Sequence, residues 1–365
     1  MVAVRVFVFV VGLGVVALTL ASASRTLLVP RAIPAAIARV VFIGVRLIFR
    51  IRAGSRHSYE RRDRTMAFYA PVSLLVLLVA WLTLVLTGYA AMYWALGVRP
   101  IWQAIVDSGS SLFTLGFARV EGVALTLLAF TEAGIGLVLL ALLITYLPAL
   151  YSGFSRREQG VAKLEVRAGN PPTGRYLIEL ANEVTGLGSL QRVWNDWEDW
   201  FVFVDETHTS NPSLVFFRSP HPDQSWITAA GAVLDGAALF VSSVDAPRSS
   251  DPDFMIRAGY LALRHIADFF GMPYDPDPAP TDPISISRAE FDEAYGHMAA
   301  AGVPMKPDRE RAWLDFAGWR VNYDTVLLEL ARLTIAPLAP WSSDRVPRGE
   351  FTPPILRRRL RRSVH

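Results

Sequence analysis

The chain has 365 residues, 52% of them hydrophobic, with a formal net charge of +3 and no cysteine. A chain of this length has room for one membrane unit and one soluble domain, and its hydrophobic fraction is higher than a soluble protein usually carries. The lack of cysteine excludes disulfides, thiolate metal sites and cysteine nucleophiles. The composition therefore predicts an integral membrane protein rather than a wholly soluble one.

Residues 1–24 form the first apolar segment. It carries a charged side chain only at Arg5 and is long enough to cross a hydrocarbon core of about 30 Å. A cleaved signal peptide is the alternative, since Ala21-Ser22-Ala23 fits a small-residue cleavage site. The apolar run is long for a signal peptide, however, and a strongly basic stretch follows it. We therefore expect a retained transmembrane helix.

Residues 25–65 are strongly basic, and the positive-inside rule places such a segment in the cytoplasm. Within it, residues 34–51 read as a helix. Arg39, Arg46 and Arg50 are spaced so that they share one face of this helix, and apolar side chains occupy the other. An amphipathic helix of this kind lies flat in the headgroup zone with its arginines towards anionic lipid. A second span of a helical hairpin is the alternative.

Two further apolar runs, residues 67–97 and 123–154, are each long enough to span a membrane. The first has no charged residue, and Tyr89, Tyr93 and Trp94 form an aromatic belt at its far end. Arginines precede the first run and follow the second, so the outer ends of both lie in the cytoplasm. The sequence thus predicts an outer helix, an external loop and an inner helix.

The external loop contains the most informative pattern of the chain. Residues 101–113 are too short and too polar to cross a bilayer, but they have the length of a re-entrant half-helix, which is tolerated where protein or a water-filled cavity covers its end. A candidate ion filter follows, made of Thr114, Leu115, Gly116, Phe117 and Ala118. Backbone carbonyls of such a filter replace the hydration shell of an ion, and the glycine permits the conformation that turns its carbonyl towards the ion.

The order of outer helix, re-entrant helix, Thr-Leu-Gly-Phe loop and inner helix resembles the two-helix pore module of the potassium-channel family, over residues 66–158. The resemblance implies a potassium-type channel in which residues 114–118 conduct a monovalent cation and no cofactor is needed. One chain supplies one filter strand, so a complete ring implies a homotetramer. The whole chain is also similar to actinobacterial ion-channel family membrane proteins with a helical cytoplasmic extension.

Two residues depart from the family's Thr-Val-Gly-Tyr-Gly pattern and the aspartate that follows it. Ala118 replaces the last glycine, and a left-handed backbone there would cost roughly 1 kcal/mol or more. Arg119 puts a cation at the mouth of the pore, with Glu121 close by in sequence as a counter-charge. These departures favour general cation passage over potassium selectivity. They also leave a second hypothesis open, a non-conducting membrane scaffold or sensor that retains the channel fold.

The inner helix carries candidate pore and gating residues. Glu132, an ionisable group inside a span, either faces the cavity and attracts cations or accepts a hydrogen bond from the back of the re-entrant helix. The candidate donors are Ser108, Ser110 and Ser111. Gly134 and Gly136 act either as a gating hinge or as small residues that allow close packing. Pro148 either kinks the helix at a gate or marks its last turns.

Residues 159–335 are predicted to form an all-helical cytoplasmic domain. Apolar residues recur every three or four positions between Leu190 and Val204, and Gly- and Pro-rich turns separate the later helical runs. These runs cover residues 226–244, 253–270, 288–301 and 308–333. Residues 336–365 read as a disordered basic tail, with lipid contact by residues 357–362 as a further option.

The cytoplasmic part offers no convincing catalytic pattern. Glu206, His208 and His221 invite a metal interpretation, but their spacing matches no known metal motif, and hydrogen bonds or helix caps explain them more simply. The sequence contains no phosphate-binding glycine loop and no nucleophile elbow. We therefore expect neither an enzyme nor a metal site, and no nucleic-acid partner. The expected location is the cell membrane, with several spans and a cytoplasmic C-terminal domain.

Overall fold

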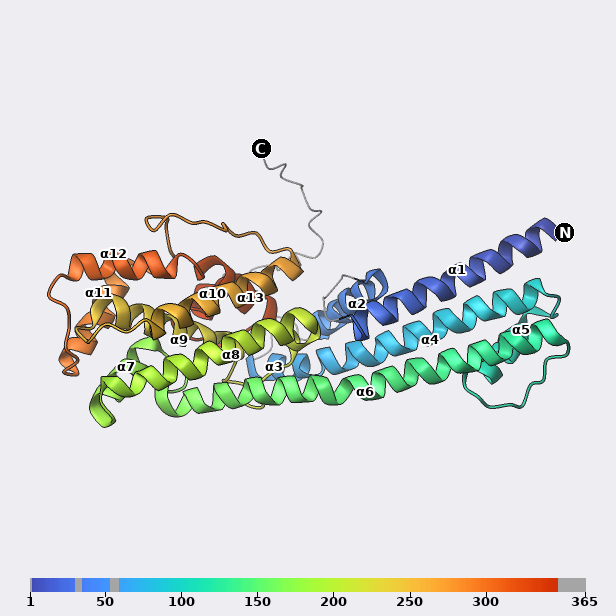
Figure 1. The fold of residues 1–365 in the computed structure, drawn as a ribbon, viewed down its shortest axis with the longest axis horizontal. Helices are drawn as coiled ribbons and strands as arrows, with labels where there is room; N and C mark the ends of the chain where they lie inside the picture. The colour runs from blue at the N-terminus through green and yellow to red at the C-terminus, as the bar shows by residue number, and fades with distance from the viewer. Residues whose placement is uncertain (1, 30–34, 53–58, 347–365) are drawn as a thin grey trace. The chain divides into compact units, whose positions relative to one another are not determined.

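The computed structural model describes residues 2–29, 35–52 and 59–346. In this part of the chain the secondary structure is helical, apart from an isolated β-bridge between Val244 and Met305. The predicted all-α class is therefore confirmed. The chain divides into two units, Met1–Ser152 and Gly153–His365 (Figure 1).

Among the described residues, four helical segments are long and apolar enough to cross a membrane: Val2–Leu27, Tyr59–Ala95, Val123–Ala168 and Trp226–Ser243. The protein buries 28%, 33% and 22% of the apolar window of the first three segments, but 89% of that of the fourth. Apolar surface that the protein leaves uncovered is suited to lipid, whereas a covered apolar helix belongs to a protein core. The first three segments thus have the character of membrane spans, which indicates a multi-pass membrane protein.

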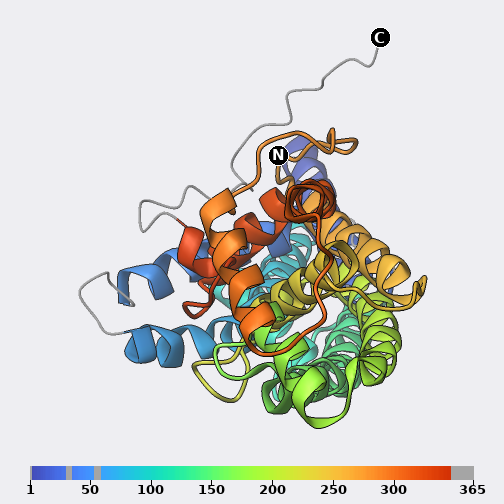
Figure 2. The same cartoon turned by 90° about the vertical axis from the view of Figure 1, so that its left-hand side faces the viewer.

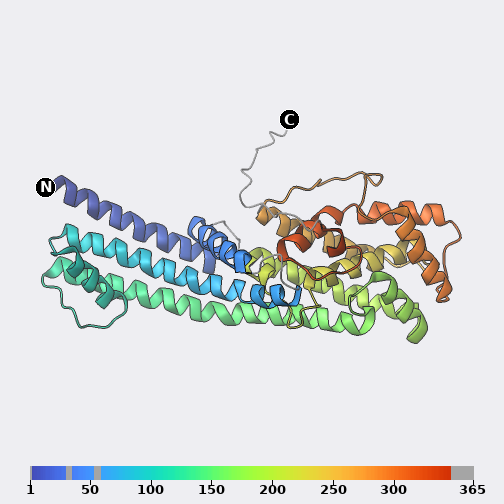
Figure 3. The same cartoon turned by 180° about the vertical axis from the view of Figure 1, so that it is seen from behind.

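Unit 1 is built from α1 (Val2–Leu27), α2 (Ala36–Arg52), α3 (Tyr59–Ala67), α4 (Tyr69–Ala95), α5 (Ile101–Leu112) and the first part of α6 (Val123–Ala168). α1 lies along α4, and α5 packs against α4 (Figure 3). The long apolar helices and the short helix between them begin within a few residues of the positions expected from the sequence. α6 ends later than expected: it continues past residue 154 to Ala168.

α1 and α4 cross at a point where two glycines face each other. A Cβ added to Gly12 would lie 2.5 Å from the carbonyl oxygen of Gly88, and one added to Gly88 would lie 2.9 Å from that of Gly12. The two backbones therefore approach as closely as small residues permit in membrane helices. Further along the interface, the buried indole N–H of Trp81 donates to the hydroxyl of Ser22 at 3.2 Å. This extended contact joins α1 to α4, and retention of residues 1–24 stays a prediction.

Gly12→Val is expected to destabilise unit 1 by about 1–3 kcal/mol, because the added side chain overlaps the Gly88 carbonyl and overpacked interfaces lose stability on this scale. Gly14→Val is the matched control, since it lies on the same helix and nothing is within 4 Å of its added Cβ. The thermal midpoint of the purified protein in detergent measures the difference. Equal midpoints for the two variants would contradict the close crossing.

α2 packs onto the beginning of α4 through Tyr69. The Tyr69 hydroxyl donates to the carbonyl oxygen of Phe42 at 3.1 Å, and the rings of Phe42 and Phe49 lie edge-on to the Tyr69 ring. Aromatic pairs in this geometry add to the stability gained by burying the rings. α2 is therefore held against the protein by one face.

The three arginines of α2 do not share one exposed face. Arg39 is exposed and Arg50 is half-buried, but Arg46 is only 4% exposed. The prediction that all three contact lipid is wrong for Arg46, because the protein covers this residue and its neighbour Val45. Lipid contact by Arg39 and Arg50 stays a prediction. The expected first residue of this helix, Pro34, lies outside the described residues.

Unit 2 begins with the C-terminal part of α6. Its other helices are α7 (Gly174–Val184), α8 (Leu190–Ser210), α9 (Trp226–Ser243), α10 (Asp251–Phe270), α11 (Arg288–Ala300), α12 (Arg309–Arg320) and α13 (Asp324–Thr334). Short 3₁₀ turns lie at Leu187–Ser189, Pro212–Phe216 and Ser343–Arg345. α9 lies at the centre and contacts α7, α10, α12 and α13, with nearly all of its residues buried (Figure 2). A helix that is apolar on all sides belongs in such a core. This position explains why α9 has the composition of a span.

The predicted helical run 308–333 is two helices. A turn at residues 321–323 separates α12 from α13. The side-chain amide of Asn322 donates to the carbonyl oxygen of Gly318 at 3.0 Å and so satisfies a carbonyl at the end of α12. Helical periodicity on both sides of this short turn hides it in the sequence.

The predicted disordered tail, residues 336–365, begins too early in the sequence. Residues 336–346 include the Ser343–Arg345 turn, and Ala339 and Ser342 are buried in unit 2. The prediction of a disordered tail is therefore wrong for this stretch, because its apolar and hydroxyl side chains pack onto the helices. Residues 347–365, which include the basic residues 357–362, lie outside the described part of the chain.

Candidate functional site

α5 enters unit 1 from one end and stops part-way along the neighbouring helices. The hydroxyl oxygen of Ser108 lies 2.9 Å from the carbonyl oxygen of Leu86, and Leu86 lies about 14 Å before the end of α4 at 1.5 Å per residue. At the last turn of α5, the carbonyl oxygen of Leu112 lies against Gly136, about 20 Å along α6 from its start at Val123. α5 therefore reaches inward by more than half the thickness of a hydrocarbon core of about 30 Å.

The loop of residues 113–122 returns from the inner end of α5 to the beginning of α6. Its extended reach of about 33 Å exceeds the distance of about 20 Å that it has to cover. The loop bulges out beside the helices (Figures 1 and 3), and Val120 near its end packs against the core of unit 1. The chain thus follows the course of a re-entrant element, with a half-helix leading in and an irregular loop leading out.

Ser110 attaches the loop to α5. Its carbonyl oxygen accepts from the N–H of Leu115 at 2.8 Å, and its hydroxyl accepts from the N–H of Ala118 at 3.1 Å. Because Ser110 is almost fully buried, both bonds hold the loop in a defined place. The sequence suggested Ser110 only as a partner for Glu132, since hydrogen bonds to an irregular loop leave no periodic pattern.

Three loop residues have a positive φ, Thr114 at +53°, Gly116 at +71° and Gly122 at +100°. Nothing lies within 4 Å of a Cβ added to Gly116, so glycine is needed there for its conformation and not for space. Thr114 is strained, because a β-branched residue rarely adopts positive φ. Strain of this kind persists where the surroundings enforce it, often at functional sites. Ala118 is not left-handed, so the backbone cost expected for it does not arise.

Glu132 lies behind α5 and is 0% exposed. Its Oε1 accepts a hydrogen bond from the hydroxyl of Ser108 at 2.5 Å. Since the residue is already covered within a single chain, its carboxyl group does not line an open cavity. Of the two roles that the sequence leaves open, the geometry supports the hydrogen bond to the back of α5.

A double-mutant cycle with Ser108→Ala and Glu132→Leu is expected to give a coupling energy of about 1–2 kcal/mol, because either change alone already removes the hydrogen bond. Glu132→Gln keeps an acceptor oxygen and should lose less stability than Glu132→Leu. The unfolding midpoints of the four proteins in detergent supply the cycle. A coupling energy near zero would contradict the bond.

Gly134 and Gly136 of α6 differ in their surroundings. A Cβ at Gly136 would overlap the carbonyl oxygen of Leu112, so glycine there allows the end of α5 to pack against α6. Nothing lies within 4 Å of a Cβ at Gly134, and a hinge at this residue stays a prediction. Pro148 lies inside α6 and does not mark its last turns, because the helix continues to Ala168.

The predicted aromatic belt is wrong for two of its three members. Tyr89 and Tyr93 are buried, and the hydroxyl of Tyr89 donates to that of Thr131 at 3.0 Å. Tyr89 therefore joins α4 to α6, and Tyr93 joins α4 to α5, because its hydroxyl lies 3.5 Å from that of Ser111; neither faces the membrane interface. Trp94 is partly exposed and lies under the guanidinium of Arg99, 4.0 Å from the ring centroid.

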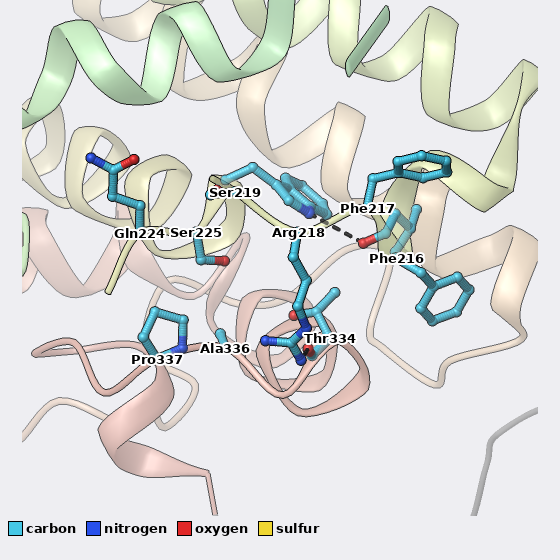
Figure 4. Close-up of a pocket in the computed structure, with 11 residues that line it drawn as sticks. Phe216, Phe217, Arg218, Ser219, Gln224, Ser225, Thr334, Ala336 and Pro337 are labelled. Carbon is cyan, nitrogen blue, oxygen red and sulfur yellow. Dashed lines mark hydrogen bonds between the residues drawn. The ribbon is translucent and has the colours of Figure 1, made fainter. Parts of the chain in front are cut away.

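Unit 2 contains a small, partly open pocket, lined by the 215–219 segment, the start of α9 and the 334–337 segment (Figure 4). Arg218 extends towards Thr334, and its guanidinium donates to the carbonyl oxygens of Thr334 at 2.6 Å and Ile335 at 3.3 Å. Ile335 is left-handed at φ +54°, and these bonds hold it at the end of α13. The cation at this pocket thus caps a helix, which is a structural role.

His208 does not join Glu206 and His221 in a metal site. It is buried, with Nε2 3.1 Å from Nη1 of Arg157 and Nδ1 3.0 Å from the hydroxyl of Thr207. Among the residues that the structure describes, no group of three or more acidic and histidine side chains is placed to hold a metal ion. Hydrogen bonding accounts for His208.

The candidate site of unit 1 therefore consists of α5, the 113–122 loop fixed by Ser110, and Glu132 behind them. This arrangement offers backbone oxygens beside two long apolar helices, with no acidic side chain on the loop between Thr114 and Ala118. Comparisons of the chain with protein-family models, with curated proteins and with solved structures find no match.

Proposed function

We propose that the protein is a cation channel of the potassium type, with unit 1 as the pore and unit 2 as a cytoplasmic regulatory domain. The observation that carries this proposal is the course of α5 and the 113–122 loop, which enter and leave unit 1 at the same end beside two long apolar helices. A polar half-helix and an irregular loop at that depth are tolerated only where protein or a water-filled path surrounds them. A conducting path accounts for both.

The loop would bind a cation through its backbone. The C-terminal end of α5 carries the negative end of the helix dipole into the inner part of the unit, which favours a cation there. Gly116 has the conformational freedom that a carbonyl-lined filter needs, and Thr114 adds a hydroxyl. Burial of Glu132 is consistent with a site that uses carbonyl oxygens instead of a carboxylate.

A single chain leaves the candidate filter uncovered. Leu115 and Phe117 are 61% and 67% exposed, and Trp102 on α5 is 67% exposed. Apolar groups exposed together mark a surface that another molecule covers. Identical chains around one axis would cover these side chains and complete a ring of carbonyls, which supports a homotetramer.

The arginine distribution supports a cytoplasmic unit 2. The basic segment 25–65 and the pair Arg156-Arg157 flank the two helices that hold the loop, and such residues stay on the cytoplasmic side. The uncovered apolar surfaces of α1, α4 and α6 would face lipid, and Arg39 and Arg50 would lie near anionic headgroups.

The purified protein is expected to be a homotetramer in mild detergent and to pass potassium ions across liposome membranes. Native mass spectrometry gives the subunit number, and a flux assay run in parallel with potassium and sodium gives conduction and selectivity. A monomer or plain dimer would contradict the proposal. A tetramer that passes neither ion would favour the non-conducting scaffold, for which the exposed cation of Arg119 on the loop is the specific observation.

A further inference from the structure

α6 continues beyond its apolar part into unit 2, where Arg157 is fully buried. Its guanidinium bonds to four groups: Oε1 of Glu158 at 2.7 Å, Nε2 of His208 at 3.1 Å, and the carbonyl oxygens of Leu214 at 2.8 Å and Phe217 at 2.7 Å. These five residues, here named the Arg157 cluster, join α6 to α8 and to the turn that follows α8. Buried arginine is tolerated only with such partners, because an unpaired buried charge is very costly.

The packing around the cluster is close. A Cβ added to Gly160 would lie 2.5 Å from the Trp200 indole, whose N–H donates to the carbonyl oxygen of Arg157 at 3.0 Å. Val161 and Leu164 of α6 are also buried in unit 2. The C-terminal part of α6 is therefore a core element of unit 2, held by the Arg157 cluster at its beginning.

His208 is neutral in this arrangement. A guanidinium has only N–H donors, so Nε2 of His208 must offer its lone pair to Arg157. The single ring proton then lies on Nδ1, which donates to the hydroxyl oxygen of Thr207 at 3.0 Å. A second ring proton would remove the acceptor and point a positive N–H at the guanidinium.

We propose that the Arg157–His208 hydrogen bond is an acid-sensitive switch that holds residues 153–168 of α6 in unit 2 at neutral pH and releases them when His208 is protonated. As a means of regulating a pore, the switch rests on the proposed channel function. α6 is one helix from Val123 to Ala168, so release of its C-terminal part changes the constraint on the part that would line the pore. As a property of unit 2, the switch is independent of conduction.

The groups around His208 oppose its protonation. Arg157 on α6 faces the ring and is ion-paired with Glu158, the ring of Trp226 on α9 packs against it at 5.3 Å between centroids, and the turn after α8 presents carbonyl oxygens to Arg157. Burial, followed by the charge of Arg157, lowers the pKa of His208 well below its usual value near 6.5. The released histidine gains a proton below about pH 6.5, whereas the buried one does not. Acid therefore shifts the equilibrium towards release by up to about tenfold per pH unit below that value.

Thiol labelling can measure the release, because the chain has no native cysteine. Val161→Cys reports on a buried position of α6, and Ala162→Cys on its exposed neighbour. In the full-length protein, the ratio of the two labelling rates cancels the pH dependence of the thiol chemistry itself. We expect this ratio to rise by up to about tenfold between pH 6.5 and pH 5.5.

Histidine variants separate the switch from general acid effects. His208→Gln keeps an oxygen acceptor for Arg157 but does not titrate, so its ratio should stay constant with pH. His208→Phe removes the acceptor and should give a raised ratio already at neutral pH, again without pH dependence. His265→Gln is the matched control, since His265 is exposed and pairs with Asp205 at 2.8 Å, and it should keep the rise of the parent. A flat ratio in the parent, or an equal rise in His208→Gln, would overturn the switch.

Liposome flux at the same pH values separates this inference from the channel proposal. Flux that changes with the labelling ratio in the parent, but not in His208→Gln, supports regulation of the pore by the switch. A labelling response in a protein that carries no flux at any pH refutes the channel and leaves the switch standing. Flux that ignores pH while labelling responds would overturn the regulatory role.

Discussion

Gly116→Val is expected to abolish cation flux while leaving the oligomeric state unchanged. Gly116 has φ +71°, a conformation that a β-branched residue rarely adopts, so the loop would have to rearrange around the new side chain. The added Cβ meets nothing within 4 Å in the single chain, which means that folding of unit 1 should not suffer. The loss would thus fall on the direction of the loop carbonyls, which the proposed filter needs.

Gly97→Val provides the matched control for this experiment. Gly97 is also left-handed, at φ +116°, and also has no atom within 4 Å of an added Cβ, but it precedes α5 and lies outside the 113–122 loop. We expect this variant to lose some stability at the end of α4 and to keep its flux. If Gly116→Val conducts like the parent, or if both variants lose flux equally, the 114–118 segment is not a filter.

Arg320→Leu is expected to destabilise unit 2 by about 3–5 kcal/mol, the range found when one partner of a buried ion pair is removed. The guanidinium of Arg320 is fully buried and donates to Asp235 at 2.5 Å, to Asp324 at 2.7 Å and to the carbonyl oxygen of Trp341 at 2.7 Å. Leucine would leave two buried carboxylates without their cation. It would also free residue 341, which the bond attaches to the end of α12.

Arg311→Leu is the matched control on the same helix. Its side chain is 70% exposed and pairs with Asp315 at 3.0 Å, so its loss should cost less than about 1 kcal/mol. Urea unfolding of the full-length protein, followed by tryptophan fluorescence, compares the two variants. Similar midpoints for Arg311→Leu and Arg320→Leu would contradict the structural role of the buried cluster.

Local signals in the sequence were sufficient to locate most helices. The short helix now seen as α5 lies between Pro100 and a glycine-containing loop, and the later helices are bounded by prolines, glycines and capping side chains such as Ser287, which accepts from the N–H of Glu290. The sequence also located α9, although its nearly complete burial could be recognised only from the structure. Long apolar runs without charge need no tertiary information to be predicted as helices.

The role of Arg157 could not be predicted from the sequence. Arg156 and Arg157 look alike as a basic pair at the end of a span, yet Arg156 is exposed over the ring of Phe203 and Arg157 is fully buried. Adjacent positions on a helix point in directions about 100° apart, so only one of them faces the core. The partners of Arg157, among them His208 and Leu214, are distant in sequence, and no local pattern connects them.

The crossing of α1 and α4 limits how small a functional fragment of this protein can be. A fragment that begins at Tyr59 would leave the indole N–H of Trp81 without the hydroxyl of Ser22, in surroundings where lipid tails offer no acceptor. It would also open a groove beside Gly88 that flexible hydrocarbon chains cannot fill as well as a helix backbone does. The smallest stable subunit of the proposed pore should therefore have three membrane helices around its re-entrant loop, not two.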